Sequence, residues 1–128
     1  MAITAAPFPT LPVADLERAT RFYEGTLGFT PSDEQMTLGG KLYEVNGGKV
    51  WLYETDAAGT ARNTAAAWFV DDIEAEVTRL ASAGVAFETF EAPDLKWEGS
   101  IASMGDLRSA WFKDTEGNTL CIDEMVGH

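Results

Sequence analysis

The sequence predicts an α+β fold in which two β-α-β-β-β modules make up one domain of 128 residues. The first observation is an internal repeat: the pattern Val-x-Asp-[Leu/Ile]-Glu occurs at residues 13–17 and again at residues 70–74. A short apolar stretch typical of a strand precedes each copy, and apolar side chains at helical spacing follow it. The second observation is a glycine turn followed by an alternating strand late in each half, at residues 47–54 and 116–123. Two such modules, residues 1–58 and 64–128, can pair into a curved mixed sheet around a common cleft.

The repeat also predicts where the two helices begin and end. Asp15 and Asp72 stand where a helix N-cap is needed, because a carboxylate at that position accepts free backbone N–H groups. Gly28 and Gly84 stand where a left-handed residue commonly ends a helix. The first strands are expected at residues 8–13 and 65–70, and the later strands near residues 29–38, 40–46, 49–55, 85–91, 108–114 and 118–124.

Charge and composition exclude several classes of partner. Nine Lys and Arg against 21 Asp and Glu give a net charge of −12, which disfavours binding to nucleic acid or to an anionic membrane. The sequence has one cysteine, which excludes an internal disulfide framework. Its one histidine is His128, the last residue, so we expect no histidine-based site within the fold. The sequence contains no apolar run of about 18 residues, no signal-peptide pattern and no glycine-rich nucleotide motif. We therefore expect a cytoplasmic protein that neither spans a membrane nor carries a nucleotide cofactor.

Three segments resemble the vicinal oxygen chelate superfamily, which includes glyoxalase I, extradiol dioxygenases, fosfomycin-resistance enzymes and bleomycin-resistance binding proteins. They are LPVADLERATRFYEGTLGF at residues 11–29, WFVDDIEAEVTRLASAGV at residues 68–85 and AWFKDTEGNTLCIDE at residues 110–124. The last is similar to a D-P-x-G-N strand signature, with Thr115 in place of proline. The resemblance implies the glyoxalase/bleomycin resistance/dihydroxybiphenyl dioxygenase fold. It does not select one function, because this fold supports many chemistries.

The resemblance also implies where a metal would be bound. Enzymes of the superfamily hold a divalent metal through one His, Glu or Gln from each of four strands, and the corresponding positions here are Phe8, Leu52, Ala65 and Cys121. A shift of one residue would bring in Tyr53, but the match of Leu52 with Cys121 in the repeat argues against it. One thiol does not make a divalent metal site. We therefore predict a protein with neither a metal nor another cofactor.

Strand alternation predicts which side chains face the cleft. Trp51, Trp68 and Trp111 are expected to fill cores, whereas Trp97 lies in a predicted loop, residues 91–105, and can offer a stacking surface to a ligand. The predicted ligand-binding residues are Phe8, Thr10, Val50, Leu52, Glu54, Ala65, Ala67, Phe69, Trp97, Cys121 and Asp123.

Charged side chains near this cleft suggest further roles. Asp94 and Glu98 flank Trp97 and can meet a cationic group. Glu54 and Asp123 occupy equivalent places in the repeat, so acid–base work by this pair is an alternative to simple exposure at strand ends. Cys121 lacks a histidine base within the fold and is predicted to be a buried apolar side chain rather than a nucleophile.

Three functions are compatible with these observations. The favoured one is a metal-free small-molecule binding protein of the bleomycin-resistance type, which holds an aromatic or cationic compound. The missing metal ligands favour a binding protein over an enzyme, and the sequence leaves residual catalytic activity open. The alternatives are a glyoxalase-like lyase, isomerase or dioxygenase with a non-standard or absent metal site, and a regulatory or interaction module. A homodimer is expected, because members of this superfamily commonly complete their cavities with strands of a partner and because exposed strand edges need covering.

Overall fold

The first module of the computed structural model has the predicted strand–helix–strand order. The structure describes residues 3, 5–35 and 39–127. Strand β1 (Thr10–Val13) leads into α1 (Leu16–Thr20), which continues as a π-helical turn η1 (Arg21–Thr26). Three strands follow, β2 (Thr30–Pro31), β3 (Gly40–Val45) and β4 (Gly48–Glu54), and the sheet order is β1-β4-β3-β2 with β1 parallel to β4. Part of the strand predicted at residues 29–38 lies outside the described residues.

The second module repeats this order and adds a hairpin. Strand β5 (Thr64–Phe69) precedes α2 (Ile73–Ser82), and β9 (Leu107–Lys113) and β10 (Thr119–Met125) form the centre of the sheet. Between α2 and β9 along the chain lie the short β6 (Phe87–Glu88) and a hairpin of β7 (Lys96–Glu98) and β8 (Ile101–Met104). The sheet order is β5-β10-β9-β8-β7, and β6 also pairs with β9. The sequence predicted one loop over residues 91–105, so the hairpin corrects that prediction.

Helix ends follow the predicted rules. Asp15 accepts a hydrogen bond from the N–H of Arg18 at 3.0 Å, and Asp72 accepts one from the N–H of Ala75 at 3.1 Å. Gly28 and Gly84 have positive φ angles of 79° and 97°, a conformation that glycine adopts without the strain of a Cβ.

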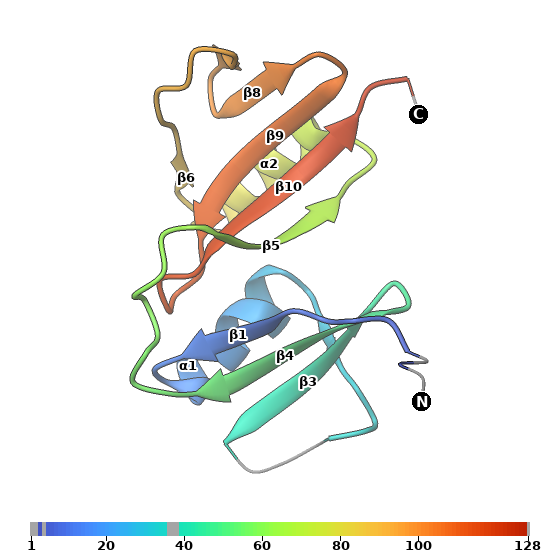
Figure 1. Ribbon diagram of the computed structural model, residues 1–128, viewed down its shortest axis with the longest axis vertical. Coiled ribbons are helices and arrows are strands. Elements are labelled where there is room, and N and C mark those ends of the chain that lie inside the picture. The colour runs from blue at the N-terminus through green and yellow to red at the C-terminus, as the bar shows by residue number, and fades with distance from the viewer. Residues whose placement is uncertain (1–2, 4, 36–38, 128) are drawn as a thin grey trace.

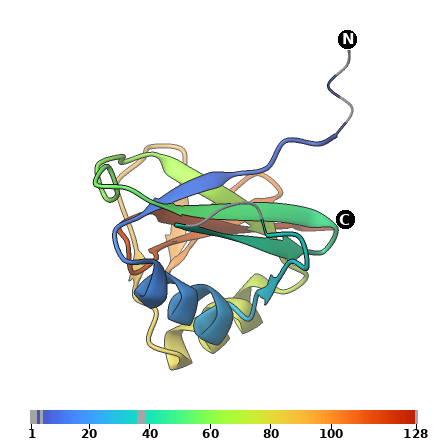
Figure 2. The same cartoon turned by 90° about the horizontal axis from the view of Figure 1, so that it is seen from below.

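The two sheets present their uncovered faces on the same side of the molecule. Figure 1 looks onto these faces, with the helices behind the sheets, and Figure 2 shows both helices on the opposite side. A single hydrophobic core joins the modules on the helix side, and its members include Leu11, Tyr23, Leu52, Leu80 and Phe112. The predicted α+β architecture of two β-α-β-β-β modules is therefore confirmed. No helix in the described part of the chain is long and apolar enough to cross a membrane.

A buried carboxylate joins the modules at one end of their boundary. Glu116, in the turn before β10, accepts hydrogen bonds from the N–H groups of Ala14 and Asp15 at 2.9 and 3.0 Å. The guanidinium of Arg18 donates to the same carboxylate at 2.8 and 3.0 Å, and Thr115 donates at 2.8 Å. The second module thus holds the start of α1 in place.

Candidate ligand-binding face

The side of each sheet that faces away from the helices is called here the open face. Cα partners across neighbouring strands point to the same side of a sheet, so the register identifies its members. In the first module Thr10 and Pro12 on β1 pair with Trp51 and Tyr53 on β4. In the second module the open face comprises Ala67, Phe69, Ser109, Trp111, Cys121 and Asp123.

Three residues predicted for the cleft lie on the other side of the sheet. Val50 and Leu52 are 2% and 0% exposed and belong to the core, since Leu52 pairs with the buried Leu11. The carboxylate of Glu54 accepts a hydrogen bond from the N–H of Leu16 at the start of α1, at 3.1 Å. The predicted orientation of these three side chains was therefore wrong. The alignment behind it was shifted by one residue, and such a shift moves every side chain of a strand to the opposite face.

The error comes from the choice between two adjacent glycines. The prediction aligned Gly48 with Gly117, but Gly47 is the one that shares its positive φ of 86°. Aligned on Gly47, the counterpart of Cys121 is Trp51, and the counterpart of Glu54 is Glu124 rather than Asp123. Contacts agree with this alignment, because Glu124 accepts a hydrogen bond from the N–H of Ile73, the first residue of α2, at 2.8 Å.

The proposed acid–base pair of Glu54 and Asp123 is not brought together. Glu54 lies on the helix side of the first sheet, whereas Asp123 lies on the open face of the second. Asp123 accepts hydrogen bonds from Ser109 and, at 3.4 Å, from the thiol of Cys121. Burial, and after it the neighbouring carboxylate of Asp123, raise the pKa of that thiol from 9.0 to about 12. Cys121 therefore stays protonated near neutral pH, which makes it a poor nucleophile.

The four positions that would hold a metal do not fit one. With the corrected alignment they are Phe8, Trp51, Ala65 and Cys121, of which only the cysteine has a ligating atom. Ala65 is moreover the extra residue of a bulge, since the register with β10 shifts from Thr64 to Ala66 at this point. The described residues contain no group of three or more His, Cys, Asp or Glu that could hold a metal ion. The side chains at these four positions therefore do not form a divalent metal site.

Aromatic side chains are exposed on the open face of the first module. Phe8 and Tyr53 are each 38% exposed. The indole of Trp51 lies over Gly40, since a Cβ at Gly40 would stand 2.2 Å from two of its ring atoms. An aromatic face of this kind suits a flat ligand or the surface of a partner.

The second module gathers three aromatic rings over its sheet. Trp97 lies in β7, opposite Ala102, and its ring centroid is 5.4 Å from that of Phe90 and 6.0 Å from that of Trp111. Phe90 and Trp111 are 4.9 Å apart. We call Phe90, Trp97 and Trp111 the aromatic triad. Phe90 and Trp111 border an apolar cavity of about 210 Å³ whose walls also include Leu95, Met104 and Ser109. Trp97 instead borders a more open hollow on the other side of Phe90.

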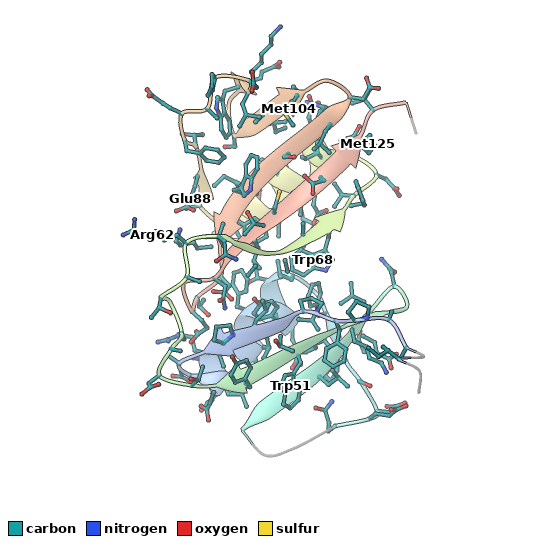
Figure 3. All side chains as sticks on the ribbon, viewed as in Figure 1. Trp51, Arg62, Trp68, Glu88, Met104 and Met125 are labelled. Carbon is teal, nitrogen blue, oxygen red and sulfur yellow. The ribbon has the colours of Figure 1, made fainter. Side chains whose placement is uncertain are left out.

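A second hollow, the seam cleft, lies where the modules meet, and the sequence did not predict it. Trp68 lies at this boundary in Figure 3, and its ring is 5.5 Å from that of Phe29 in the other module. The cleft has a volume of about 760 Å³. It combines aromatic walls with several carboxylates, and its lining includes Phe29, Trp68, Phe69, Glu44, Asp71, Asp72 and Glu76.

The polar contacts between the modules were also missed. Tyr23 donates a hydrogen bond to Asp114 at 2.6 Å, and Asn118 donates to the backbone oxygen of Pro12 at 2.9 Å. Burial, together with the charge of Asp114, raises the pKa of Tyr23 well above 10. Asp114, Glu116 and Asn118 all belong to the D-x-x-G-N segment at residues 114–118. This segment could have indicated the polar contacts between the modules, but from the sequence alone it predicted only a strand.

A family model settles the relationship that this geometry suggests. The model of the Glyoxalase/Bleomycin resistance protein/Dioxygenase superfamily matches residues 5–122. The chain belongs to this superfamily. None of the curated proteins searched matches it.

Solved structures of the superfamily's fold cover nearly the whole chain. TnmS3, an antibiotic binding protein from Streptomyces sp. CB03234, is 25% identical with a TM-score of 0.65, and the match covers 98% of both chains. The fosfomycin resistance protein FosX from Listeria monocytogenes is 18% identical with a TM-score of 0.70, covering 96% of this chain and 94% of that one. An integron cassette protein from the mobile metagenome of V. cholerae is 23% identical with a TM-score of 0.64 and 97% coverage of each chain. The last two show the fold alone.

Proposed function

We propose that this member of the superfamily is a metal-free protein that binds an aromatic or cationic small molecule on its open faces. The observation that carries the proposal is that the four metal positions hold Phe8, Trp51, Ala65 and Cys121, in a protein whose open faces carry exposed aromatic rings. TnmS3, which covers the same length of chain, is described as an antibiotic binding protein, and this supports a binding function.

Metal content tests the first part of the proposal. The expected result is less than 0.1 equivalent of Mn, Fe, Ni or Zn per chain, by elemental analysis after purification without chelator and dialysis. Aromatic and aliphatic side chains supply no ligating atom, and one protonated thiol binds a divalent ion weakly. A stoichiometric metal that survives dialysis would contradict the proposal.

The preference for a cation follows from the charges near the aromatic rings. Asp94 and Glu98 are exposed beside Trp97, and Asp123 lies on the open face, whereas Glu54 no longer contributes. A cation over an aromatic face gains about 0.5–2 kcal/mol, and nearby carboxylates attract it from solution.

A matched pair of dyes tests this preference. We expect the cation 9-aminoacridine to bind at least fivefold more tightly than the anion acridine-9-carboxylate at 20 mM salt, by isothermal titration calorimetry. The difference should shrink at 500 mM salt, because added ions screen exposed charges. Equal affinities of the two dyes at both salt concentrations would contradict the preference for a cationic ligand. If neither dye bound, the proposed binding function itself would be contradicted.

We further propose that two copies of the chain associate through their open faces. Phe69 is 73% exposed and Phe90 46% exposed, and Phe8 and Tyr53 add to the same side of the molecule. Exposed aromatic side chains that gather on one side of a molecule are typical of interfaces. Sedimentation equilibrium at 10–100 μM should give about twice the chain mass of 13.9 kDa. A mass that stays near 13.9 kDa would contradict this part of the proposal.

A further inference from the structure

The side chain of Trp97 carries a buried hydrogen-bond donor without an acceptor. Among the side-chain nitrogen and oxygen atoms of the described residues, Nε1 of Trp97 is the one that is buried without a hydrogen-bond partner. Trp111, its neighbour in the aromatic triad, differs in this respect, because its Nε1 donates to Thr64 Oγ1 at 3.2 Å. A buried N–H of tryptophan normally has a partner, since leaving it unpaired costs free energy. The missing acceptor therefore calls for an explanation.

The surroundings of Trp97 provide flat apolar surface. Phe90 meets Trp97 edge to face at an interplanar angle of 83° and meets Trp111 at 72°. Phe90 borders both the 210 Å³ cavity over the sheet and a more open hollow on the side of Trp97. Because Phe90 is itself 46% exposed, it can be displaced by a ring that enters from solvent. The 210 Å³ cavity is below the roughly 300–1,000 Å³ of sites for drug-sized ligands, so one small fused ring system fits best.

The polar groups around the triad restrict the ligand further. Ser109 lines the cavity, and its hydroxyl already donates to Asp123. The carboxylates of Glu91, Asp94 and Glu98 belong to exposed residues. A cationic substituent, where the ligand has one, therefore lies outside the cavity, near these carboxylates.

From this arrangement we propose that the aromatic triad binds a small fused aromatic ring that carries an in-plane hydrogen-bond acceptor, and that the acceptor pairs with the Nε1–H of Trp97. The acceptor is a ring nitrogen or a ring carbonyl. This inference rests on the proposed binding function and adds the ligand's chemistry and its place on the second module.

Quinoline and naphthalene test the inference, because they have the same shape and only quinoline has an in-plane acceptor. The readout is the ratio of the naphthalene Kd to the quinoline Kd, measured by calorimetry at pH 7.5. Trp97→Phe removes the N–H and keeps an aromatic ring, so this ratio should fall about tenfold, which corresponds to about 1.4 kcal/mol. Trp111→Phe is the matched control, since its N–H is already bonded to Thr64, and the ratio should stay within twofold.

A second measurement does not depend on the folding of a variant. In ¹H–¹⁵N spectra of the wild-type protein, quinoline should shift the Nε1–H resonance of Trp97 downfield by at least 0.3 ppm. Naphthalene should leave that resonance nearly unchanged, and the Trp111 resonance should respond alike to both compounds.

Each outcome bears on the inference or on the function beneath it. A ratio that is the same in wild type and Trp97→Phe, with no downfield shift of Trp97, overturns the inference even where 9-aminoacridine still binds. Failure of quinoline, naphthalene and both acridines to bind overturns the proposed function as well. A tenfold change confined to Trp97→Phe supports both.

Discussion

Replacement of Glu116 by glutamine should destabilise the protein and also change how its stability depends on pH. The carboxylate is buried and receives five hydrogen bonds, from Ala14, Asp15, Arg18 twice and Thr115. Glutamine keeps the size and one acceptor oxygen, but it places an NH₂ group among donors. The variant therefore approximates the protonated form of the native side chain.

The pKa of Glu116 sets the expected magnitude. Burial alone would raise this pKa, but the hydrogen bonds from Arg18, Asp15, Thr115 and Ala14 outweigh it and lower the pKa from 4.5 to about 2. Such a difference corresponds to about 3 kcal/mol, at about 1.36 kcal/mol per pH unit. Because the folded-state pKa is the lower one, this stability is present above pH 4.5 and is lost as the pH falls toward 2.

Urea unfolding followed by tryptophan fluorescence measures the effect. At pH 7 we expect Glu116→Gln to unfold with a free energy about 3 kcal/mol below that of wild type, and at pH 3 the gap should narrow to about 1.4 kcal/mol. Glu17→Gln is the control: Glu17 is exposed and pairs with Arg21 at 3.5 Å, so its replacement should change stability by no more than about 0.5 kcal/mol. A gap below 1 kcal/mol at pH 7, or one that is constant with pH, would refute the reasoning.

Two further predictions concern the open faces. Gly40→Ala should lower the free energy of unfolding by about 1–3 kcal/mol, because the added Cβ would collide with the ring of Trp51. Gly25→Ala is the control: its Cβ would meet no atom within 4 Å, so it should not destabilise the protein. Thermal unfolding compares the two variants, and equal stability would contradict the expected collision at Gly40. In the folded protein at pH 8, Cys121 should react with a thiol reagent at least 100-fold more slowly than in the protein unfolded in 8 M urea. The reason is that burial, and after it Asp123, raise the pKa of the thiol to about 12. Comparable rates in the two states would show that the folded protein has an accessible thiolate.

The repeat was enough to predict the modules and the ends of their helices. The pattern around Asp15 and Asp72 predicted both N-caps, because capping depends on local sequence alone. Face assignments on β4 failed for a physical reason: Gly47 and Gly48 are adjacent, and only the backbone angle shows which of them makes the turn. An error of one residue then moved Leu52 from the core to the open face.

The parts of the site that depend on long-range packing were less visible. Trp97 was selected as a ligand contact in a loop, but the hairpin that contains it forms because β8 pairs with β9, a contact that composition does not reveal. The burial of Glu116 depends on the start of α1, about a hundred positions earlier in the sequence. Neither the sequence around Glu116 nor that around the start of α1 indicates by itself that the two segments are in contact.

Glu116 has no equivalent in the first module, and this breaks the symmetry of the duplicated chain. On the alignment that matches Gly47 with Gly117, its counterpart is Asn46, which lines the seam cleft together with Asp71 and Asp72. The start of α1 is therefore held by a charged side chain from the other module, while the corresponding place before α2 borders a hollow. A chain assembled from two copies of the first module would lack this carboxylate, whereas two copies of the second would carry it twice. The halves have thus become complementary parts, and neither can replace the other.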